Sequence, residues 1–307
     1  MSRPPAVACE GAPRDLGLDQ GRFAHHLVAQ ALGELPTAGF LDRWLPDPHE
    51  PAVRLGRDLR RYFPHMAERT TGLARGARVP ERALWELLRG VVGRTSGAAL
   101  AVAGSVVRAI DFPALDILVR RSTPGEDFRS IDLVVPGLVP ALAGVNEHGL
   151  VVVASWSVGS GVEDTEPCRA PGLLLVQDCL QRFSGVGAAV EWCERRPAGG
   201  ETTIVLADGS GALAAVHVTP QVRQVVEPRD GLLVAPFATQ RAEALRKQVS
   251  SATRLDGASL GAALRAEEEA RDLLVHFEPG APRLGVQGPE DAAPEWIELV
   301  PGKAGSG

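Results

Sequence analysis

The sequence has few cysteines, few aromatic residues and no long hydrophobic segment. Its 307 residues include four cysteines, one tyrosine and two methionines, and aromatic residues make up 5% of the chain. The cysteine spacing gives neither a C-x-x-C pair nor a zinc finger. We therefore expect buried or inert thiols in a reducing cytoplasm and no bound metal. We also expect no cofactor. No apolar run is long enough to cross a bilayer, and the first residues lack the apolar core of a secretory signal, so we expect neither feature.

The chain also lacks a dominant charge. It carries 32 Lys and Arg against 38 Asp and Glu, a net charge of −6, and the two signs are interspersed. Binding to nucleic acid or to an anionic membrane needs clustered positive charge, so we expect neither partner. What remains is an ordinary globular composition, 45% apolar and 23% charged, in a chain long enough to bury a sizeable core.

The first ninety residues are predicted to be mostly helical. One short strand is expected at residues 5–10. Helical spacing of apolar residues then covers 15–35, 51–66 and 68–75, and a further helix begins at Pro80, a residue favoured in the first helical turn.

From residue 97 onward, apolar runs of strand length dominate. The predicted strands cover 98–103, 106–110, 115–119, 131–135, 138–145, 150–155, 202–207, 212–218, 222–227, 231–235, 283–287 and 295–300. The predicted helices cover 171–183, 186–195, 238–248 and 257–276. Strands cluster, helices cluster and strands return, which favours an α+β fold over βαβ alternation.

Residues 98–110 are predicted to form a β-hairpin. Two runs rich in Val and Ala flank Gly104-Ser105, the spacing of a two-residue turn. Thr95 and Ser96 precede the hairpin, Arg108 lies in its second strand, and Asp111 follows it. Pairing of the strands would bring these hydroxyls, a fixed cation and a carboxylate to one end of a small sheet, where we expect a site.

Four segments carry a family resemblance. Residues 11–17, 62–77, 136–150 and 206–234 contain GAPRDLG, YFP with GLARGA, PGL with GVNEHGL, and LADGSG with PRDGLLV. Their order along nearly the whole chain resembles the penicillin acyltransferase and linear-amide hydrolase group of N-terminal-nucleophile hydrolases, relatives of choloylglycine hydrolase. The resemblance implies an α+β fold, a four-layer αββα sandwich. It divides the chain into a helical pro-segment-like region, 1–93, and a core, 94–307, within one compact domain.

The resemblance also implies a nucleophile that this chain lacks. In that family the precursor cuts itself in front of a Cys, and the freed α-amino group activates the new thiol. Arg94 occupies that position here, and a guanidinium stays protonated and cannot attack a carbonyl. Thr95 is the alternative nucleophile if cleavage falls one residue later, although this shift moves the attacking oxygen to the other face of the strand.

Three positions of the resemblance keep polar residues. Arg108 and Asp111 would either hold an α-amine and a substrate carboxylate or form an ion pair that fixes the hairpin. Asn146 is a candidate pocket residue, but its neighbours favour a turn in which Gly149 takes a positive φ.

Three further positions complete the candidate pocket. Trp156 and Phe237 stand where the family has amide-contributing residues, which makes the pocket more apolar. Arg254 follows two serines and is aligned with a pocket arginine of the family.

Two functions are therefore expected. The first is a catalytically silent relative that binds a small acyl or amide compound or a protein partner. The second is an active acyltransferase or linear-amide hydrolase that uses Thr95 after self-cleavage. The motif favours the first, and the sequence leaves open whether the chain forms a homo-oligomer.

Overall fold

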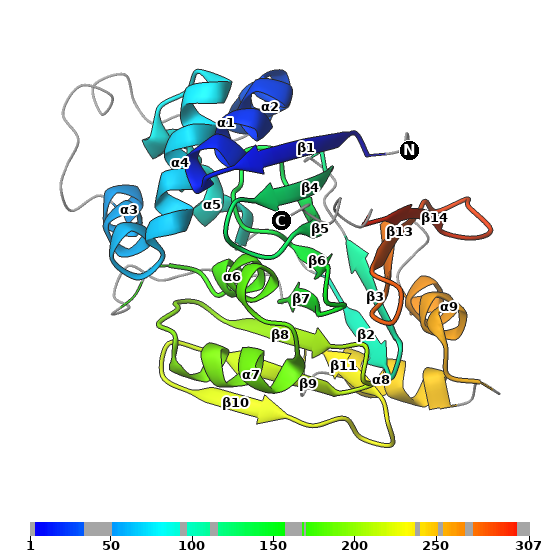
Figure 1. Cartoon of the computed structure of the whole chain (residues 1–307). Coiled ribbons are helices and arrows are strands. Elements are labelled where there is room, and N and C mark those ends of the chain that lie inside the picture. Colours follow the sequence, from blue (N-terminus) through cyan, green and yellow to red (C-terminus); the bar gives the residue numbers. More distant parts are fainter. Residues whose placement is uncertain are drawn as a thin grey trace, which may run out of the picture.

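The structure is a computed structural model of the chain (Figure 1). It describes residues 4–33, 51–92, 97–110, 116–156, 168, 170–236, 240–250, 254–267 and 273–299.

Two β-sheets face each other in the middle of the molecule. The first sheet runs in the order β1 (Ala6–Gly11), β4 (Leu118–Pro124), β5 (Ser130–Val134), β6 (Ala143–Asn146), β7 (Val151–Ser155), β8 (Thr202–Ala207), β9 (Leu213–Val218) and β10 (Arg223–Val226). The second runs in the order β11 (Leu233–Ala235), β2 (Ala99–Val102), β3 (Ser105–Ile110), β12 (Leu273–Glu278), β13 (Arg283–Gln287) and β14 (Glu295–Glu298). Within these strands, β1 and β4 pair in parallel and the other neighbours are antiparallel.

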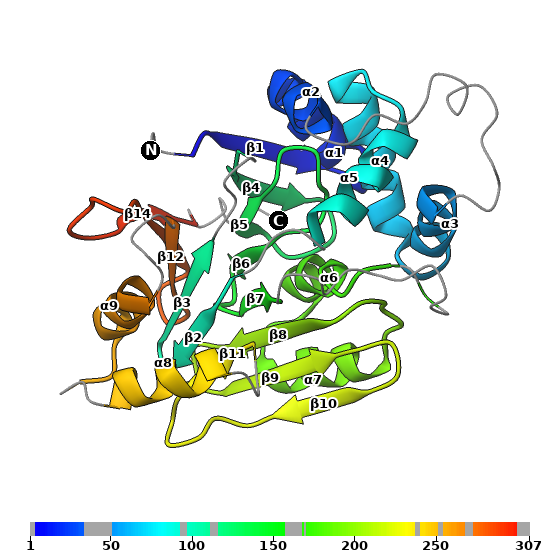
Figure 2. The ribbon, with the colours of Figure 1, turned by 180° about the vertical axis from the view of Figure 1, so that it is seen from behind.

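Helices cover the outer face of each sheet. On the side of the first sheet, α1 (Pro13–Phe23), α6 (Leu174–Arg182) and α7 (Val186–Arg195) contact its strands, and α4 (Pro64–Ala77) packs along α1. Helices α2 (His25–Gly33), α3 (Pro51–Tyr62) and α5 (Glu81–Val92) pack on α4 and on one another. The helices against the second sheet are α8 (Gln240–Ser250) and α9 (Gly257–Glu267), seen from behind in Figure 2. The layers confirm the predicted α+β sandwich of helices, sheet, sheet and helices.

The two faces of the second sheet belong to different cores. Val106 and Ile110 point toward the first sheet and join the large core between the sheets. Val107 and Ala109 alternate with them and pack with apolar residues of α8 and α9. Because side chains alternate along a strand, this pattern determines to which face of the second sheet each polar side chain of β3 points.

Glycines bring α1 and α4 into backbone contact. A Cβ on Gly17 would lie 1.9 Å from the carbonyl oxygen of Arg69, and one on Gly72 would lie 1.9 Å from that of Arg14. Since no side chain fits at such distances, both positions require glycine. Glycines of the GAPRDLG and GLARGA motifs therefore have a packing role.

Predicted helix boundaries need two corrections in the N-terminal half. The helix expected over 15–35 is divided at Ala24 into α1 and α2. The helix expected over 51–66 ends at Tyr62, and α4 then begins at Pro64, because a proline has no N–H to continue the previous helix and restricts the residue before it.

The second sheet corrects two further predictions. The helix expected over 257–276 is wrong at its end, since Leu273–Glu278 form β12 between β3 and β13. The hairpin turn consists of Ala103 and Gly104, because Val102 pairs with Ser105 and Gly104 has a φ of +81°. The predicted turn was therefore displaced by one residue.

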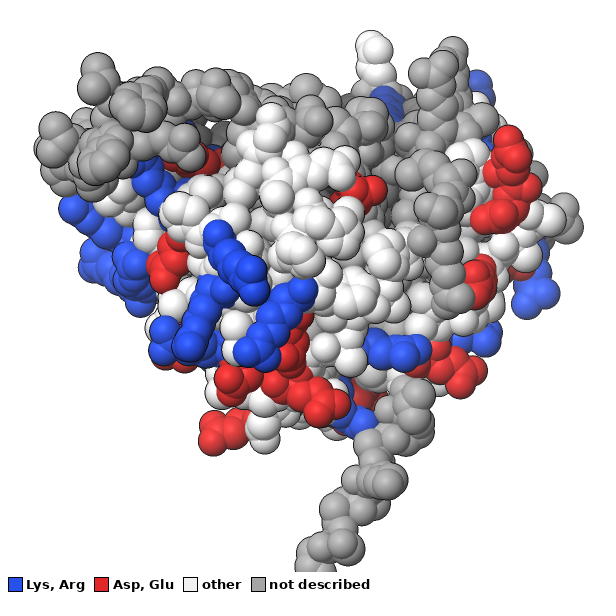
Figure 3. All heavy atoms as spheres, turned by 90° about the horizontal axis from the view of Figure 1, so that it is seen from above, with Lys and Arg blue, Asp and Glu red and all other residues white. Residues whose placement is uncertain are grey.

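Surface charge agrees with the sequence pattern. On the face seen in Figure 3, positive side chains have negative ones beside them. Among the described helices, none is both long and apolar enough to span a bilayer.

Candidate functional site

Among the predicted site residues that the structure describes, Arg108 is the one whose guanidinium lies between the sheets. It stands in β3 opposite Ala99 of β2, on the face that Val106 and Ile110 share. Its side chain is fully buried. Nη1 donates a hydrogen bond of 2.5 Å to the carbonyl oxygen of Leu142, the residue before β6. The side chain thus crosses from the second sheet to the first.

The start of β2 closes over this guanidinium. Gly97 forms an antiparallel bridge with Trp156, and Ser155 donates a hydrogen bond of 2.6 Å from its hydroxyl to the Gly97 carbonyl. A Cβ on Gly97 would lie 3.4 Å from Nε and 3.5 Å from Nη2 of Arg108, and 2.7 Å from the Ala109 carbonyl oxygen. The backbone therefore lies directly against the guanidinium.

Trp156 forms a buried wall of the site. The guanidinium carbon of Arg108 lies 4.9 Å from the centroid of the Trp156 ring, within range of a cation–π interaction. Trp156 follows the end of β7, and β7 pairs with the strand that follows Leu142. One hairpin of the first sheet thus supplies both groups that contact Arg108.

The guanidinium is only partly satisfied. Nε and Nη2 have no hydrogen-bond partner in the described part of the chain, and no carboxylate there pairs with them. Burial lowers the pKa of Arg108 to about 9, so the group is still charged at neutral pH. The site therefore presents a buried positive charge with two donor groups available beside the start of β2.

This arrangement can bind oxygen but cannot attack a carbonyl. A charged guanidinium donates hydrogen bonds to a carboxylate, an amide carbonyl or an oxyanion, and it is neither a base nor a nucleophile. The Ser155 hydroxyl already donates to Gly97. The described residues of the site therefore include hydrogen-bond donors that can bind a ligand oxygen. They do not include a group placed to act as a nucleophile.

Five predicted positions cannot be placed. Arg94, Thr95, Ser96, Asp111 and Phe237 lie outside the described residues. Their neighbours do converge on the site. Gly97 follows Ser96, and Ala235 of β11 pairs with Ala99 at the same end of β2.

Asn146 is not brought to this site. It ends β6, whereas Trp156 follows β7 at the opposite end of the same hairpin. Its amide nitrogen donates to the carbonyls of Leu180 and Phe183, at 3.0 and 2.7 Å, and its oxygen accepts from two backbone N–H groups of the turn. Gly149 has a φ of +81°, which confirms the predicted turn.

Arg254 lies on the other side of the second sheet. It lines a cavity beside α9, its side chain is 84% exposed, and its Nε lies 3.4 Å from a carboxylate oxygen of Asp256. Arg108 points to the opposite face of the same sheet, so the structure does not bring these two arginines together.

Sequence reasoning missed Gly97, Leu142 and Ser155. Leu142 contributes a backbone carbonyl, for which no side chain gives a signal. Ser155 and Gly97 lie beside predicted positions, but only the pairing of two distant strands shows that they meet.

It also missed a charged cluster between helices. The buried carboxylate of Asp178 lies 3.0 Å from His65 Nε2 and 3.0 Å from Arg182 Nε, and it accepts a 2.7 Å hydrogen bond from Trp192. Burial alone would raise the pKa of Asp178, but hydrogen bonds and charges from these three neighbours lower it overall. The cluster joins α4, α6 and α7 and lies outside the candidate site.

Metal binding has no support in the described residues, where no group of three or more His, Cys, Asp or Glu side chains has the arrangement of a metal site. Cys9, Cys168, Cys179 and Cys193 are all buried, and none of them forms a disulfide with another of the four.

Comparison with known proteins gives likenesses to solved structures, of which three are described. No protein-family model matches the sequence, and no curated protein matches it. Penicillin V acylase from Agrobacterium tumefaciens is 14% identical, with a TM-score of 0.45, over 66% of this chain and 86% of its own. An N-acylethanolamine-hydrolyzing acid amidase ortholog from Caenorhabditis elegans is 11% identical, with a TM-score of 0.46, over 60% and 94%.

The third likeness is a variant of conjugated bile acid hydrolase from Clostridium perfringens. It is 12% identical, with a TM-score of 0.43, over 66% of this chain and 92% of its own. At these identities and TM-scores, likeness alone assigns neither a family nor an activity to this chain.

Proposed function

We propose that this chain is a catalytically silent relative of the N-terminal-nucleophile amide hydrolases that binds a small acyl or amide compound through Arg108. The observation that carries the proposal is the buried, charged guanidinium whose Nε and Nη2 lack partners among the described residues. A ligand oxygen is the partner that such donors require.

Energetics support a ligand at this position. Each buried donor without a partner costs about 1–3 kcal/mol, and a hydrogen bond to a charged group contributes about 1.5–3 kcal/mol. A carboxylate or an amide carbonyl that accepts hydrogen bonds from Nε and Nη2 would remove the cost of the unpartnered donors. It would also add the stabilisation of the new charged hydrogen bonds. Trp156 and the apolar residues between the sheets would contact the acyl part.

The residue at position 94 supports binding without cleavage. Arg94 stands in the sequence where the resembling family has its nucleophilic Cys. Its guanidinium cannot attack a carbonyl, and no described neighbour of Arg108 replaces the thiol.

Mass spectrometry of the purified chain tests whether it cleaves itself. We expect one intact species of 32.4 kDa and no new N-terminus. Fragments divided at residues 94 and 95 would overturn the proposal and support the alternative, an active acyltransferase or linear-amide hydrolase with Thr95 as nucleophile.

Ligand binding is tested with a fatty acid and its primary amide. We expect either compound to bind the intact protein, and Arg108→Met to weaken binding by about tenfold or more, since a charged hydrogen bond is lost. Equal affinity of the native chain and Arg108→Met would refute the role of this arginine.

A further inference from the structure

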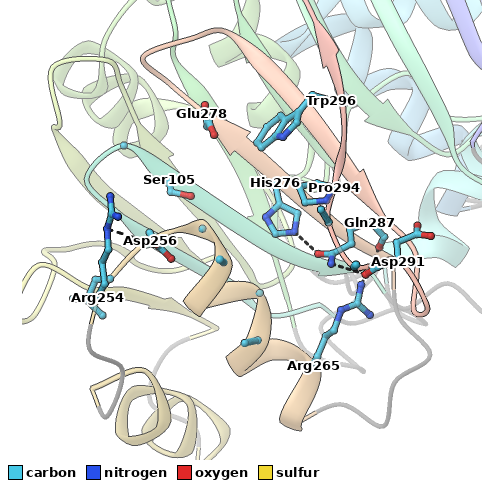
Figure 4. A pocket seen from close by; sticks show the side chains of 18 of the residues that line it. Ser105, Arg254, Asp256, Arg265, His276, Glu278, Gln287, Asp291, Pro294 and Trp296 are labelled. Atoms are coloured by element: carbon cyan, nitrogen blue, oxygen red, sulfur yellow. Dashed lines mark hydrogen bonds and ion pairs between the residues drawn. The ribbon is translucent and has the colours of Figure 1, made fainter.

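The cavity that Arg254 lines is on the outer side of the second sheet, away from Arg108. It has a volume of about 770 Å³ and opens between α9 and the strands β12, β13 and β14 (Figure 4). Polar and aromatic side chains line it. Those used below are Ser105, Arg265, His276, Glu278, Gln287 and Trp296.

The protonation of His276 follows from its neighbours. Gln287 donates a 2.9 Å hydrogen bond from its amide nitrogen to the Asp291 carbonyl, so its amide oxygen faces His276. His276 Nε2 lies 2.9 Å from that oxygen and must carry the proton. Burial lowers the pKa of His276, so the ring is neutral at neutral pH and Nδ1 keeps its lone pair.

Ser105 and His276 both lie next to Gly257 at the cavity floor. Ser105 Oγ lies 2.7 Å and His276 Nδ1 lies 3.8 Å from the point that a Cβ on Gly257 would occupy. Ser105 is 9% exposed and His276 is 4% exposed. In the described part of the chain, neither atom has a hydrogen-bond partner, and both residues line the cavity.

Glu278 adds an acceptor on the same face. The register of β3 and β12, with Val106 opposite Phe277, puts Ser105 opposite Glu278, and Glu278 is two residues after His276. Arg283 donates from Nε and Nη2 to one carboxylate oxygen of Glu278, Oε2, at 2.9 and 2.6 Å. The other oxygen, Oε1, remains available to a ligand.

We infer that this cavity binds a protonated primary amine, with Ser105, His276 and Glu278 accepting hydrogen bonds from its –NH₃⁺ group. A primary ammonium carries three N–H donors and one positive charge, which match three acceptors of which one is a carboxylate. Trp296 lies at the cavity wall beside His276, with the ring centroids 6.4 Å apart, and offers apolar surface to the carbon chain.

An anionic ligand fits less well at the cavity floor, where the guanidinium of Arg265 already has backbone partners. Arg265 donates to the carbonyls of Gln287, Gly288 and Pro289. Arg254 pairs with Asp256 at the cavity mouth. Among the described residues at the cavity floor, Ser105 Oγ, His276 Nδ1 and Glu278 Oε1 can each accept a hydrogen bond and have no protein partner.

Isothermal titration calorimetry of the full chain with three probes tests this inference. The probes are n-butylammonium, n-butyltrimethylammonium, which keeps the charge but has no N–H, and n-butanol, which has one donor and no charge. We expect n-butylammonium to bind at least about tenfold more tightly than either other probe, because each of them loses charged hydrogen bonds. Equal binding of n-butanol or of n-butyltrimethylammonium would overturn the inference, and so would the absence of measurable heat with n-butylammonium.

Two variants and a control locate the binding. Ser105→Ala is expected to weaken n-butylammonium binding several-fold and Glu278→Gln about tenfold. Glu227→Gln makes the same charge change at an exposed position outside the cavity and should leave binding unchanged. Unfolding curves show whether each variant is folded. If Glu278→Gln does not fold, Ser105→Ala alone tests the site. In that case, an affinity of Ser105→Ala for n-butylammonium equal to that of Glu227→Gln would refute the site.

Discussion

Replacing Arg108 by methionine should stabilise the ligand-free protein while weakening ligand binding between the sheets by about tenfold or more. The side chain is fully buried and charged, and its described contacts are one hydrogen bond to Leu142 and the ring of Trp156. Methionine has a similar length, no charge and no donor, and it can fill the same space against Trp156.

The magnitude follows from opposing terms. Arg108→Met loses a charged hydrogen bond of about 1.5–3 kcal/mol and a cation–π interaction of up to about 2 kcal/mol. It removes two unpartnered donors, at about 1–3 kcal/mol each, together with the cost of burying a charge. Replacing buried charges by well-packed apolar groups often stabilises by about 1–4 kcal/mol, and we expect a change in that range.

Equilibrium unfolding in urea measures this change. We expect a higher midpoint for Arg108→Met at an unchanged slope. The matched control is Arg120→Met, which removes another fully buried arginine. Arg120 lies 2.9 Å from Asp132 and donates to Gln20 and to a backbone carbonyl, so its loss should destabilise by about 3–5 kcal/mol.

The opposite result for Arg108 would refute the reasoning. If Arg108 and Asp111 form a structural ion pair, Arg108→Met leaves a carboxylate without its partner and destabilises by about 3–5 kcal/mol, as Arg120→Met does. The change in the free energy of unfolding thus distinguishes two roles of Arg108: binding a ligand and stabilising the hairpin.

Three further outcomes are expected. Arg94→Cys should restore some self-cleavage, seen as two fragments by mass spectrometry; a wholly intact variant would mean that the rest of the pocket no longer supports the reaction. Gly72→Ala should destabilise by several kcal/mol, roughly 3 or more, because its Cβ would lie 1.9 Å from a backbone oxygen of α1; a thermal melt with an unchanged midpoint would contradict this. Asp178 has a lowered pKa in the folded state, so its stabilisation is present above its unfolded pKa of about 3.9 and is lost as the pH falls through the lower folded value. Between pH 6 and pH 3, the free energy of unfolding in urea should therefore fall less for Asp178→Asn than for the native chain. An equal fall in the two proteins would contradict this prediction.

Local pattern was enough to predict much of the fold. Apolar runs of strand length located β2, β3 and most strands of the first sheet, because a strand buried on both faces needs such a run. The same reasoning failed at Leu273–Glu278, which was read as the end of a helix. The strand there is stabilised by pairing with β3 and β13. These neighbours are distant in the sequence or follow the strand, so the residues of the segment itself do not reveal the pairing.

The candidate site was predictable only in part. Arg108 is a charged residue inside an apolar strand, so its sequence context identified it. Asn146 and Arg254 resembled pocket residues of a family, yet one closes a turn and the other lies beyond the sheet. Which distant residues surround Arg108 depends on how two sheets stack, and spacing along the chain does not contain that information.

The parallel pairing of β1 with β4 affects how any cut near residue 94 would be detected. Ala6 lies opposite Val119, and α1 follows β1 directly, so the first ninety residues supply an edge strand to the sheet and helices that cover it. A nicked molecule would hold its two pieces together without a covalent bond and would elute from a sizing column like the uncut protein. Only a denaturing separation would reveal the break.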